Sequence, residues 1–387
     1  MTANTDVDWA SVSPAVELDD PGLAIDLAQI FIRTNGKIIA TELAGDMLVG
    51  HIHSTANDVE LNAPVRILDA NRLPTIDVTA ENITMDSGLD GGVGGIGLPS
   101  LPNPSSPNPA DPGNLGGFLE INTDVNSNGG VLNADDTAAN DAQTKGIYLD
   151  ELTGNIPVDL IWAAGHAADV TTGNVGLRTV NGSIVDARND LGDNVRGQSI
   201  DIDANGGSIG ELNNDLDIDS SRGSSPPCDK DNCADTDAGF SDPGLAAVND
   251  DVGLEATQNI YLTETDAYLR LVLAHAVNGD IRITVGETAA HDEDFFLIKS
   301  GAARFAESNT RAPSGDDLDA PRSVPKGQIF AEVGSVELRV GDDLATHQNS
   351  ETLANLGIDI FGDFGDADAG WGTSMILRGR IIADCVV

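Results

Sequence analysis

Residues 259–283 read NIYLTETDAYLRLVLAHAVNGDIRI, and they align with residues 37–61, KIIATELAGDMLVGHIHSTANDVEL, at a constant offset, with matches such as Thr41-Glu42 against Thr263-Glu264 and His53 against His275. Ile38 is thereby set against Ile260, and the alignment needs no gap. A third copy lies between these two, where Ile147 stands against Ile38. The chain therefore carries an internal repeat, and such a repeat is the primary guide to its architecture.

Within these copies, tight turns precede short runs in which apolar and polar residues alternate. Alternation is typical of a strand with one buried face, and each run is only about four to six residues long. Helical periodicity is weak throughout. The recurring local signal is a triplet of glycine, a small polar residue and a β-branched residue: Gly154-Asn155-Ile156, Gly173-Asn174-Val175, Gly182-Ser183-Ile184, Gly207-Ser208-Ile209, Gly279-Asp280-Ile281 and Gly334-Ser335-Val336.

These features predict an all-β chain folded as a parallel β-helix or solenoid, with the right-handed form as the expected hand. In such a fold each coil buries its apolar face only by stacking on its neighbours. An array of β-sandwich modules is the alternative, because a period of roughly 110 residues also suits immunoglobulin-like domains. The solenoid is favoured because the triplets recur at uneven spacing within a module and no Trp or Tyr core signature recurs between modules.

The repeat divides the chain into a lead-in segment and three solenoid modules. Two stretches interrupt the modules and are expected to be exposed loops, because one is rich in proline and the other in Cys, Asp and Ser. The predicted parts are residues 1–36 (lead-in), 37–146 (first module, with a Pro-rich insertion at 98–113 and an Asp/Asn loop at 122–136), 147–259 (second module, with a Cys/Asp insertion at 220–244) and 260–387 (third module and C-terminal edge).

The composition favours a thin aliphatic core and a need for cations. Aromatic residues make up only 4% of the chain, and the formal net charge is −43, from 20 Lys and Arg against 63 Asp and Glu. Such a charge repels itself in any compact state and argues against nucleic acid or an anionic membrane face as a partner. Calcium is the expected neutralising ion. No apolar run long enough to cross a membrane and no leader sequence is found, so no membrane insertion is expected.

Three stretches resemble the repeat regions of large secreted bacterial exoproteins of the haemolysin-type calcium-binding and filamentous-haemagglutinin-like families. They are residues 182–219, which include GSIVDARND and GQSIDIDANGGSIGELNNDLDID, residues 259–285, and residues 362–381, GDFGDADAGWGTSMILRGRI. The resemblance implies a parallel β-helix, export to the cell surface, adhesion or matrix building, and calcium. The calcium-binding nonapeptide of that family is not repeated here, since Ile96 stands where it requires aspartate.

The best candidate for a calcium loop begins at Asp124. Oxygen ligands at the first, third and fifth positions, Gly129 at the sixth and a carboxylate at the twelfth follow the order of an EF-hand loop, in which the chain wraps the cation with a sharp bend at the glycine. The ligands would be Asp124, Asn126, Asn128 and Asp135. An Asn/Gly-rich surface turn is the alternative.

Two further acidic loops are candidates for calcium. The first places carboxylates at alternating positions beside Cys228, a spacing that resembles a fragment of thrombospondin type 3 calcium repeats; a solvated acidic loop is the alternative. The second crowds carboxylates into one turn between two apolar strands, where they repel unless a cation or protons intervene. The residues are Asp229, Asp231, Asp235 and Asp237 in the first loop, and Asp363, Asp366 and Asp368 in the second.

No catalytic residue is predicted. Residues 206–210, GGSIG, match the GxSxG pattern of a nucleophile elbow, but no α/β context of strand and helix surrounds them, so a turn is favoured. His51 and His53 share one face of an expected strand without a third ligand nearby, so a structural role is favoured over a metal site.

The function expected from the sequence is structural. The chain is predicted to be a calcium-binding, adhesive segment of a secreted bacterial surface or filament-forming protein that associates with copies of itself. The alternatives are a β-helix polysaccharide lyase or hydrolase and a phage tail-fibre segment. A lyase acting on polyuronates needs a basic groove, and the low number of Lys and Arg argues against it.

Overall fold

The computed structural model describes residues 2–3, 7–8, 29–70, 75–89, 93–98, 117–123, 125, 130–137, 144–163, 173–220, 251–288, 293–298, 327–348, 350–365, 367 and 372–384. Its regular structure consists of β-strands, and no helix occurs among these residues. Every pairing between the named strands is parallel. The predicted parallel β-solenoid is therefore confirmed, and antiparallel β-sandwich modules are excluded.

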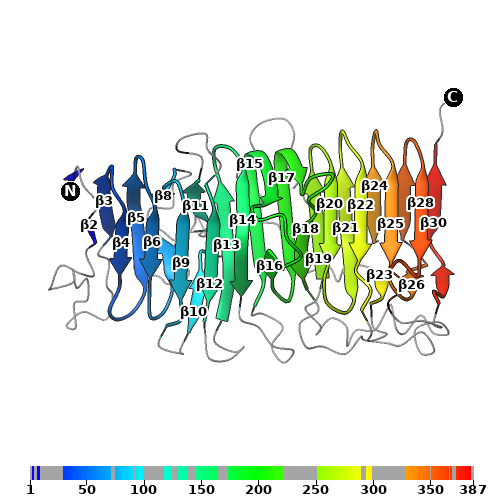
Figure 1. The fold of residues 1–387 in the computed structure, drawn as a ribbon, viewed down its shortest axis with the longest axis horizontal. Helices are drawn as coiled ribbons and strands as arrows, with labels where there is room; N and C mark the ends of the chain where they lie inside the picture. The colour runs from blue at the N-terminus through cyan, green and yellow to red at the C-terminus, as the bar shows by residue number, and fades with distance from the viewer. Residues whose placement is uncertain are drawn as a thin grey trace, which may run out of the picture.

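The strands follow one another along the long axis in chain order, with the two termini at opposite ends (Figure 1). They form two columns, in which each strand pairs with the strand of the coil before and of the coil after. Column A contains β2 (Val7–Asp8), β4 (Ile38–Thr41), β6 (Val59–Asn62), β9 (Ile83–Ser87), β12 (Leu132–Asp136), β14 (Ile156–Ala163), β16 (Val195–Arg196), β18 (Leu216–Asp219), β20 (Ile260–Glu264), β22 (Ile281–Val285), β25 (Val336–Val340) and β28 (Ile358–Gly362).

Column B forms the other two sides of each coil, either as one long strand or as two short ones. For example, the long strand β21 pairs with both β23 and β24 of the next coil. The second halves of β15 and β17 continue into column A. Column B contains β1 (Thr2–Ala3), β3 (Ile30–Thr34), β5 (Met47–Ser54), β7 (Ile67–Asp69), β8 (Val78–Thr79), β10 (Gly94–Ile96), β11 (Leu119–Asn122), β13 (Thr144–Glu151), β15 (Val175–Asp186), β17 (Ile200–Ile209), β19 (Asp251–Ala256), β21 (Leu269–Ala276), β23 (Phe295–Leu297), β24 (Gln328–Ala331), β26 (Leu344–Thr346), β27 (Glu351–Ala354), β29 (Met375–Leu377) and β30 (Arg380–Ala383).

The core is one continuous column of aliphatic side chains. Burial alternates along the strands, as in β9, where every second residue points inward. The inward residues of successive coils join into a single apolar cluster dominated by Ile, Leu, Val and Ala. Where column B turns toward column A, alanines stack in register from coil to coil: Ala204, Ala256, Ala276, Ala331 and Ala354. Because the core is only as wide as the interior of one coil, aliphatic side chains fill it and few aromatic rings are needed. This accounts for the low aromatic content.

The repeating unit of the structure is the single coil. Ile38 pairs with Val59 of the next coil, and Ile260 pairs with Ile281 in the same way. The gapless alignment of residues 37–61 with 259–283 relates strands of the same column, because Ile38 and Ile260 both lie in column A. The third copy relates different sides of the coil, because Ile147 lies in column B. The division into a lead-in segment and three modules stays a prediction.

The two predicted insertions lie almost wholly outside the described residues. Only Leu98 of residues 98–113 and Ser220 of residues 220–244 are described. No helix that could span a membrane was found in the described part of the chain.

A ladder of side-chain hydrogen bonds runs along the turn that precedes column A. In the coils from β14 to β25, the residue before the first core position is Asn, Ser or Asp, and from Asn155 to Asp280 its side-chain oxygen accepts a hydrogen bond from the backbone N–H of the corresponding residue in the next coil. This turn ladder joins Asn155 Oδ1 to Ser183 N (2.8 Å), Ser183 Oγ to Ser208 N (3.0 Å), Ser208 Oγ to Asn259 N (3.2 Å), Asn259 Oδ1 to Asp280 N (2.9 Å) and Asp280 Oδ1 to Ser335 N (2.7 Å). The middle residue of the triplets therefore satisfies turn amides that the strands leave unpaired.

The leading glycine of the triplets is required by the closeness of stacked turns. A Cβ atom added at Gly182 would lie 1.7 Å from the carbonyl oxygen of Gly154, and one added at Gly334 would lie 2.2 Å from that of Gly279. Both obstacles are backbone atoms, which cannot rotate away. The turns can therefore stack only where no side chain separates them.

We expect Gly182→Ala to lower the free energy of unfolding by about 2 kcal/mol or more, because the methyl group forces two hydrogen-bonded turns apart. Gly357→Ala is the matched control, since nothing lies within 4 Å of a Cβ atom at that turn. Urea unfolding followed by circular dichroism measures both changes. A Gly182→Ala chain as stable as the control would contradict the stacking of these turns.

Carboxyl groups are buried at the inner corners of several coils. Glu151 is fully buried, and its carboxylate accepts hydrogen bonds from the Thr123 backbone N–H at 2.9 Å and from the Thr123 hydroxyl at 3.1 Å. Burial raises the pKa of Glu151 to about 8, although these hydrogen bonds oppose the change. Glu264 is also fully buried, hydrogen-bonded to Ser220, and burial raises its pKa well above the ordinary value. With a pKa of about 8, Glu151 keeps its proton in the native state at neutral pH.

Stability should therefore fall as pH rises. The unfolded chain releases the Glu151 proton near the ordinary pKa of 4.5, whereas the folded chain keeps it up to about pH 8. Between these values the unfolded state binds fewer protons, so the free energy of unfolding decreases as pH increases. Urea unfolding at intervals from pH 4.5 to 8.5 should show a shallower decrease for Glu151→Gln than for the wild type. Equal slopes would show that Glu151 does not titrate as the structure implies.

Candidate functional site

The structure describes only two of the residues predicted to bind calcium, and they lie far apart along the solenoid. Asp135 is half-buried on β12, while Asp363 is exposed directly after β28, in the left-handed region with a φ of 55°. The remaining predicted ligands lie outside the described residues: Asp124, Asn126, Asn128, Asp229, Asp231, Asp235, Asp237, Asp366 and Asp368. Calcium binding by the three loops stays a prediction.

Asp135 shows how stacking brings carboxylates together. Its strand pairs in register with β9, so Asp135 lies beside Asp86 of the preceding coil. Burial, and after it the charge of Glu60, raise the pKa of Asp86. Acidic residues that are distant in sequence are thus held one strand spacing apart, about 4.8 Å, by the parallel register.

A buried acidic triad occurs in column B. Asp69 ends β7, Asp77 immediately precedes β8, and Glu120 is on β11. Each side chain is fully buried or almost so, and each offers a carboxylate oxygen within 4.8 Å of the others. The Glu120 backbone N–H also donates to Asp77 Oδ2 at 3.3 Å, which fixes their relative position. This acidic triad is the group of carboxylates in the described chain that could hold a metal ion.

The sequence did not reveal the triad, because its members come from three separate strands. Glu120 alternates with the core residues Leu119 and Ile121, whereas Asp69 follows a buried strand at the register position of the core residue Val49, and the two are distant from each other in the sequence. Only the register of the coils brings them together, through the pairing of Ile121 with Val78. Without that register, each residue resembles an ordinary solvated carboxylate.

The triad adjoins a row of ionisable side chains along the outer face of column B. Arg178 donates to Asp150 at 2.6 Å and lies 4.9 Å from the centre of the Phe118 ring. Adjacent acidic members stack directly on each other, an arrangement that destabilises strand pairing unless a counter-charge or proton is present. This ionisable row consists of Glu120, Asp150, Arg178, Asp203, Glu255 and His275.

His275 is the last residue of the ionisable row, and its contacts are those of a structural residue. It is almost fully buried, its Nε2 lies 2.8 Å from Glu332 Oε1, and its Nδ1 lies 3.7 Å from Glu255 Oε1. The imidazole also stacks on Phe330, with ring centres 5.4 Å apart. His51 and His53 meet edge to face at 5.7 Å, and burial lowers the pKa of His53, which favours its neutral form.

Beyond His275 this outward row becomes apolar. The same register continues through Phe330, Leu353 and Ile382. On another side of these coils, Phe296 and Ala345 belong to a second apolar cluster that is separate from the main core. The row thus changes from ionisable to apolar side chains toward the C-terminal coils, while the outward row beside it, through Gln328, Glu351 and Arg380, is polar.

Ser208 of the GxSxG pattern belongs to the turn ladder. Its hydroxyl accepts from the Asn259 backbone N–H at 3.2 Å, and its own N–H donates to Ser183 Oγ at 3.0 Å. The described residues on either side are strands or turns, not the helix that a nucleophile elbow requires. The ladder accounts for this serine.

Comparisons of the chain with protein-family models, with curated proteins and with solved structures found no significant match.

Proposed function

We propose that the chain is a stiff structural segment of a secreted or cell-surface protein, loaded with calcium and able to associate with copies of itself. The observation that supports this most strongly is the parallel pairing of successive coils, which continues from β1 and β2 to β28, β29 and β30. A column of coils extends in one direction and resists bending, because each coil is hydrogen-bonded to the next along two or three strands.

Calcium is proposed because the register stacks negative charges that the chain cannot neutralise alone. The formal charge is −43, and the acidic triad and the ionisable row place carboxylates about one strand spacing apart. Oxygen ligands in this density suit a hard divalent cation. Among the described residues, the acidic triad is the group that we propose to bind calcium, in addition to the predicted loops.

Thermal unfolding should therefore depend on calcium. A ligand that binds only the native chain adds about 2.7 kcal/mol per site at a hundredfold excess over its dissociation constant. We expect melting in millimolar calcium to occur well above melting in chelator, and Asp69→Asn to lose part of that difference. Asp359→Asn is the control, since Asp359 is exposed on β28. Identical curves with calcium and with chelator would exclude calcium from the function.

Self-association is proposed through the strand edges of the terminal coils. Among the residues that the structure describes, β28, β29 and β30 each pair with a strand on one edge alone. Their side chains include large apolar groups that remain about 40–50% exposed: Phe361, Met375, Leu377, Ile381 and Ile382. An open edge of this shape accepts parallel strands of a matching three-sided coil, and the first coil of another copy supplies them.

Negative-stain images in calcium should show filaments that shorten or disappear when a charge is placed on this edge. We expect this result for Ile382→Glu and for removal of residues 375–387, because a carboxylate on an open strand edge blocks pairing. Leu191→Glu is the control, since Leu191 is 95% exposed in a turn away from the edge. Wild-type images that show only separate particles of the size of one chain, both with and without calcium, would contradict head-to-tail association.

A further inference from the structure

The chain contains five asparagines that are followed directly by glycine, and such pairs are chemically labile. The backbone nitrogen of the glycine can attack the side-chain amide of the asparagine, because glycine has no Cβ atom to hinder the approach. Whether it does so depends on how the fold holds that nitrogen. The structure describes both residues of four pairs: Asn35-Gly36, Asn181-Gly182, Asn205-Gly206 and Asn278-Gly279.

In three of these pairs the fold restrains the glycine. The Gly36 N–H donates to Thr34 Oγ1 at 3.1 Å, and the Gly206 N–H donates to Thr257 Oγ1 at 2.8 Å. Gly182 lies inside β15, where it pairs with Gly206 of β17. Attack on the asparagine therefore requires that a hydrogen bond is broken first or that a paired strand is distorted.

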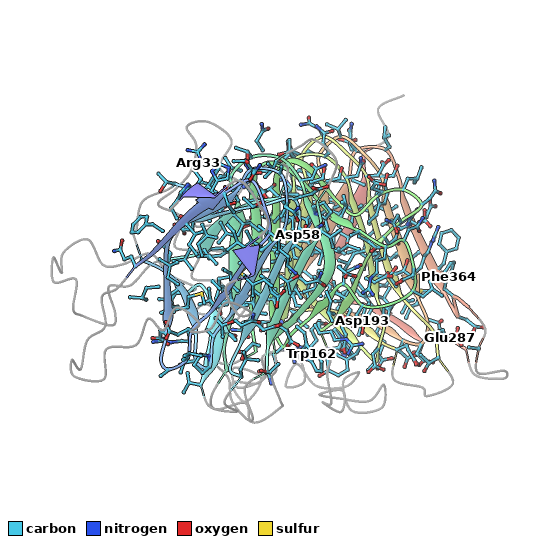
Figure 2. The ribbon with its side chains drawn as sticks, turned by 60° about the vertical axis from the view of Figure 1, so that its left-hand side comes forward. Arg33, Asp58, Trp162, Asp193, Glu287 and Phe364 are labelled. Atoms are coloured by element: carbon cyan, nitrogen blue, oxygen red, sulfur yellow. The ribbon has the colours of Figure 1, made fainter. Side chains whose placement is uncertain are left out.

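The peptide group between Asn278 and Gly279 has no such restraint. It lies outside the strands, in the turn between β21 and β22 that leads into column A; Asp58, which directly precedes β6, marks the same turn of an early coil (Figure 2). Among the residues that the structure describes, the Gly279 N–H has no acceptor and the Asn278 carbonyl oxygen has no donor. The Asn278 side chain is exposed, while its backbone N–H donates to the Thr257 carbonyl oxygen at 2.9 Å. Asn278 is thus anchored at its own nitrogen, and the peptide group that follows it can rotate.

We propose that Asn278 is a site of spontaneous deamidation, and that the product weakens the turn ladder. The Gly279 nitrogen gives its proton to hydroxide and bonds to Asn278 Cγ. The bond from Cγ to Nδ2 then breaks, ammonia leaves, and a succinimide ring remains. Water opens this ring at either carbonyl group and gives aspartate or isoaspartate, so the reaction needs no oxidant and no cofactor.

Isoaspartate disturbs this turn because the main chain then runs through the former side chain and gains one carbon atom. The turn has no room for it: a Cβ atom added at Gly279 would lie 2.4 Å from Asn259 Oδ1 and 2.6 Å from the Gln258 carbonyl oxygen. The next residue, Asp280, carries two links of the turn ladder, since its N–H donates to Asn259 Oδ1 and its Oδ1 accepts from the Ser335 N–H. A longer chain before Asp280 moves both links away from their partners.

The test incubates the folded chain at mildly alkaline pH and follows each asparagine by peptide mapping with mass spectrometry. We expect Asn278 to deamidate about fivefold faster than Asn35 and Asn205, or more, which is the factor that one net hydrogen bond supplies. Thr257→Val removes the acceptor of the Gly206 N–H, and it should speed deamidation of Asn205 while Asn278 keeps its rate. An Asn278 that reacts no faster than Asn35 and Asn205, or an Asn205 that is unaffected by Thr257→Val, overturns the inference.

Thermal unfolding of the incubated samples tests the effect on the turn. Asn278→Gln is the matched control, because glutamine closes the corresponding larger ring far more slowly and its side chain is exposed like that of Asn278. We expect the incubated wild type to melt below its fresh sample, and incubated Asn278→Gln to keep more of its melting temperature. A wild type that carries isoaspartate at position 278 and melts like the fresh chain overturns the claim that this product weakens the ladder.

Discussion

The parallel register between successive coils is the constraint on which the rest of the structure depends. Each coil must lie about 4.8 Å from the next along every side, because that is the spacing at which parallel strands hydrogen-bond. The turns must keep the same spacing, although they have no strand partners. The turn ladder from Asn155 to Ser335 meets this requirement with side-chain oxygens, and the glycines beside it allow the closest backbone approach. A core of stacked aliphatic residues then fills the interior without large rings.

The same register determines the surface. A residue type that recurs at one outward position becomes a continuous row, so charges or apolar groups are concentrated along the axis. The ionisable row from Glu120 to His275 and the apolar positions Phe330, Leu353 and Ile382 are successive parts of one such row. An acidic chain that folds in this way stacks like charges, and neutralisation by cations, arginines or protons becomes part of its stability. A proton removes the charge of the buried Glu151, and Arg178 balances the charge of Asp150. Calcium is proposed to neutralise the remaining carboxylates.

The sequence predicted the class of fold because its local signals have a direct physical cause in the coil. The Gly-polar-aliphatic triplets mark the turn ladder, and the alternation of residues 259–283 marks strands with one buried face. The size of the repeat was harder to predict, since the third copy sets Ile147, in column B, against Ile38, in column A. The acidic triad could not be predicted. Its members become neighbours only through the register of the coils, which is not visible in local spacing.

Distances between spin labels along one row of turns test the coil register most directly. Three exposed residues suit the labels, because they occupy equivalent places in the turn that precedes column A. Successive members lie four coils apart: Ala56, Asn181 and Val333. The native cysteines are replaced by serine, and spin labels are attached to pairs of introduced cysteines. Double electron–electron resonance should give a label-to-label distance of about 20 Å for Ala56→Cys with Asn181→Cys and about 40 Å for Ala56→Cys with Val333→Cys, in proportion to the number of coils. Distances that do not double, or that spread over a broad range, would contradict a single parallel solenoid.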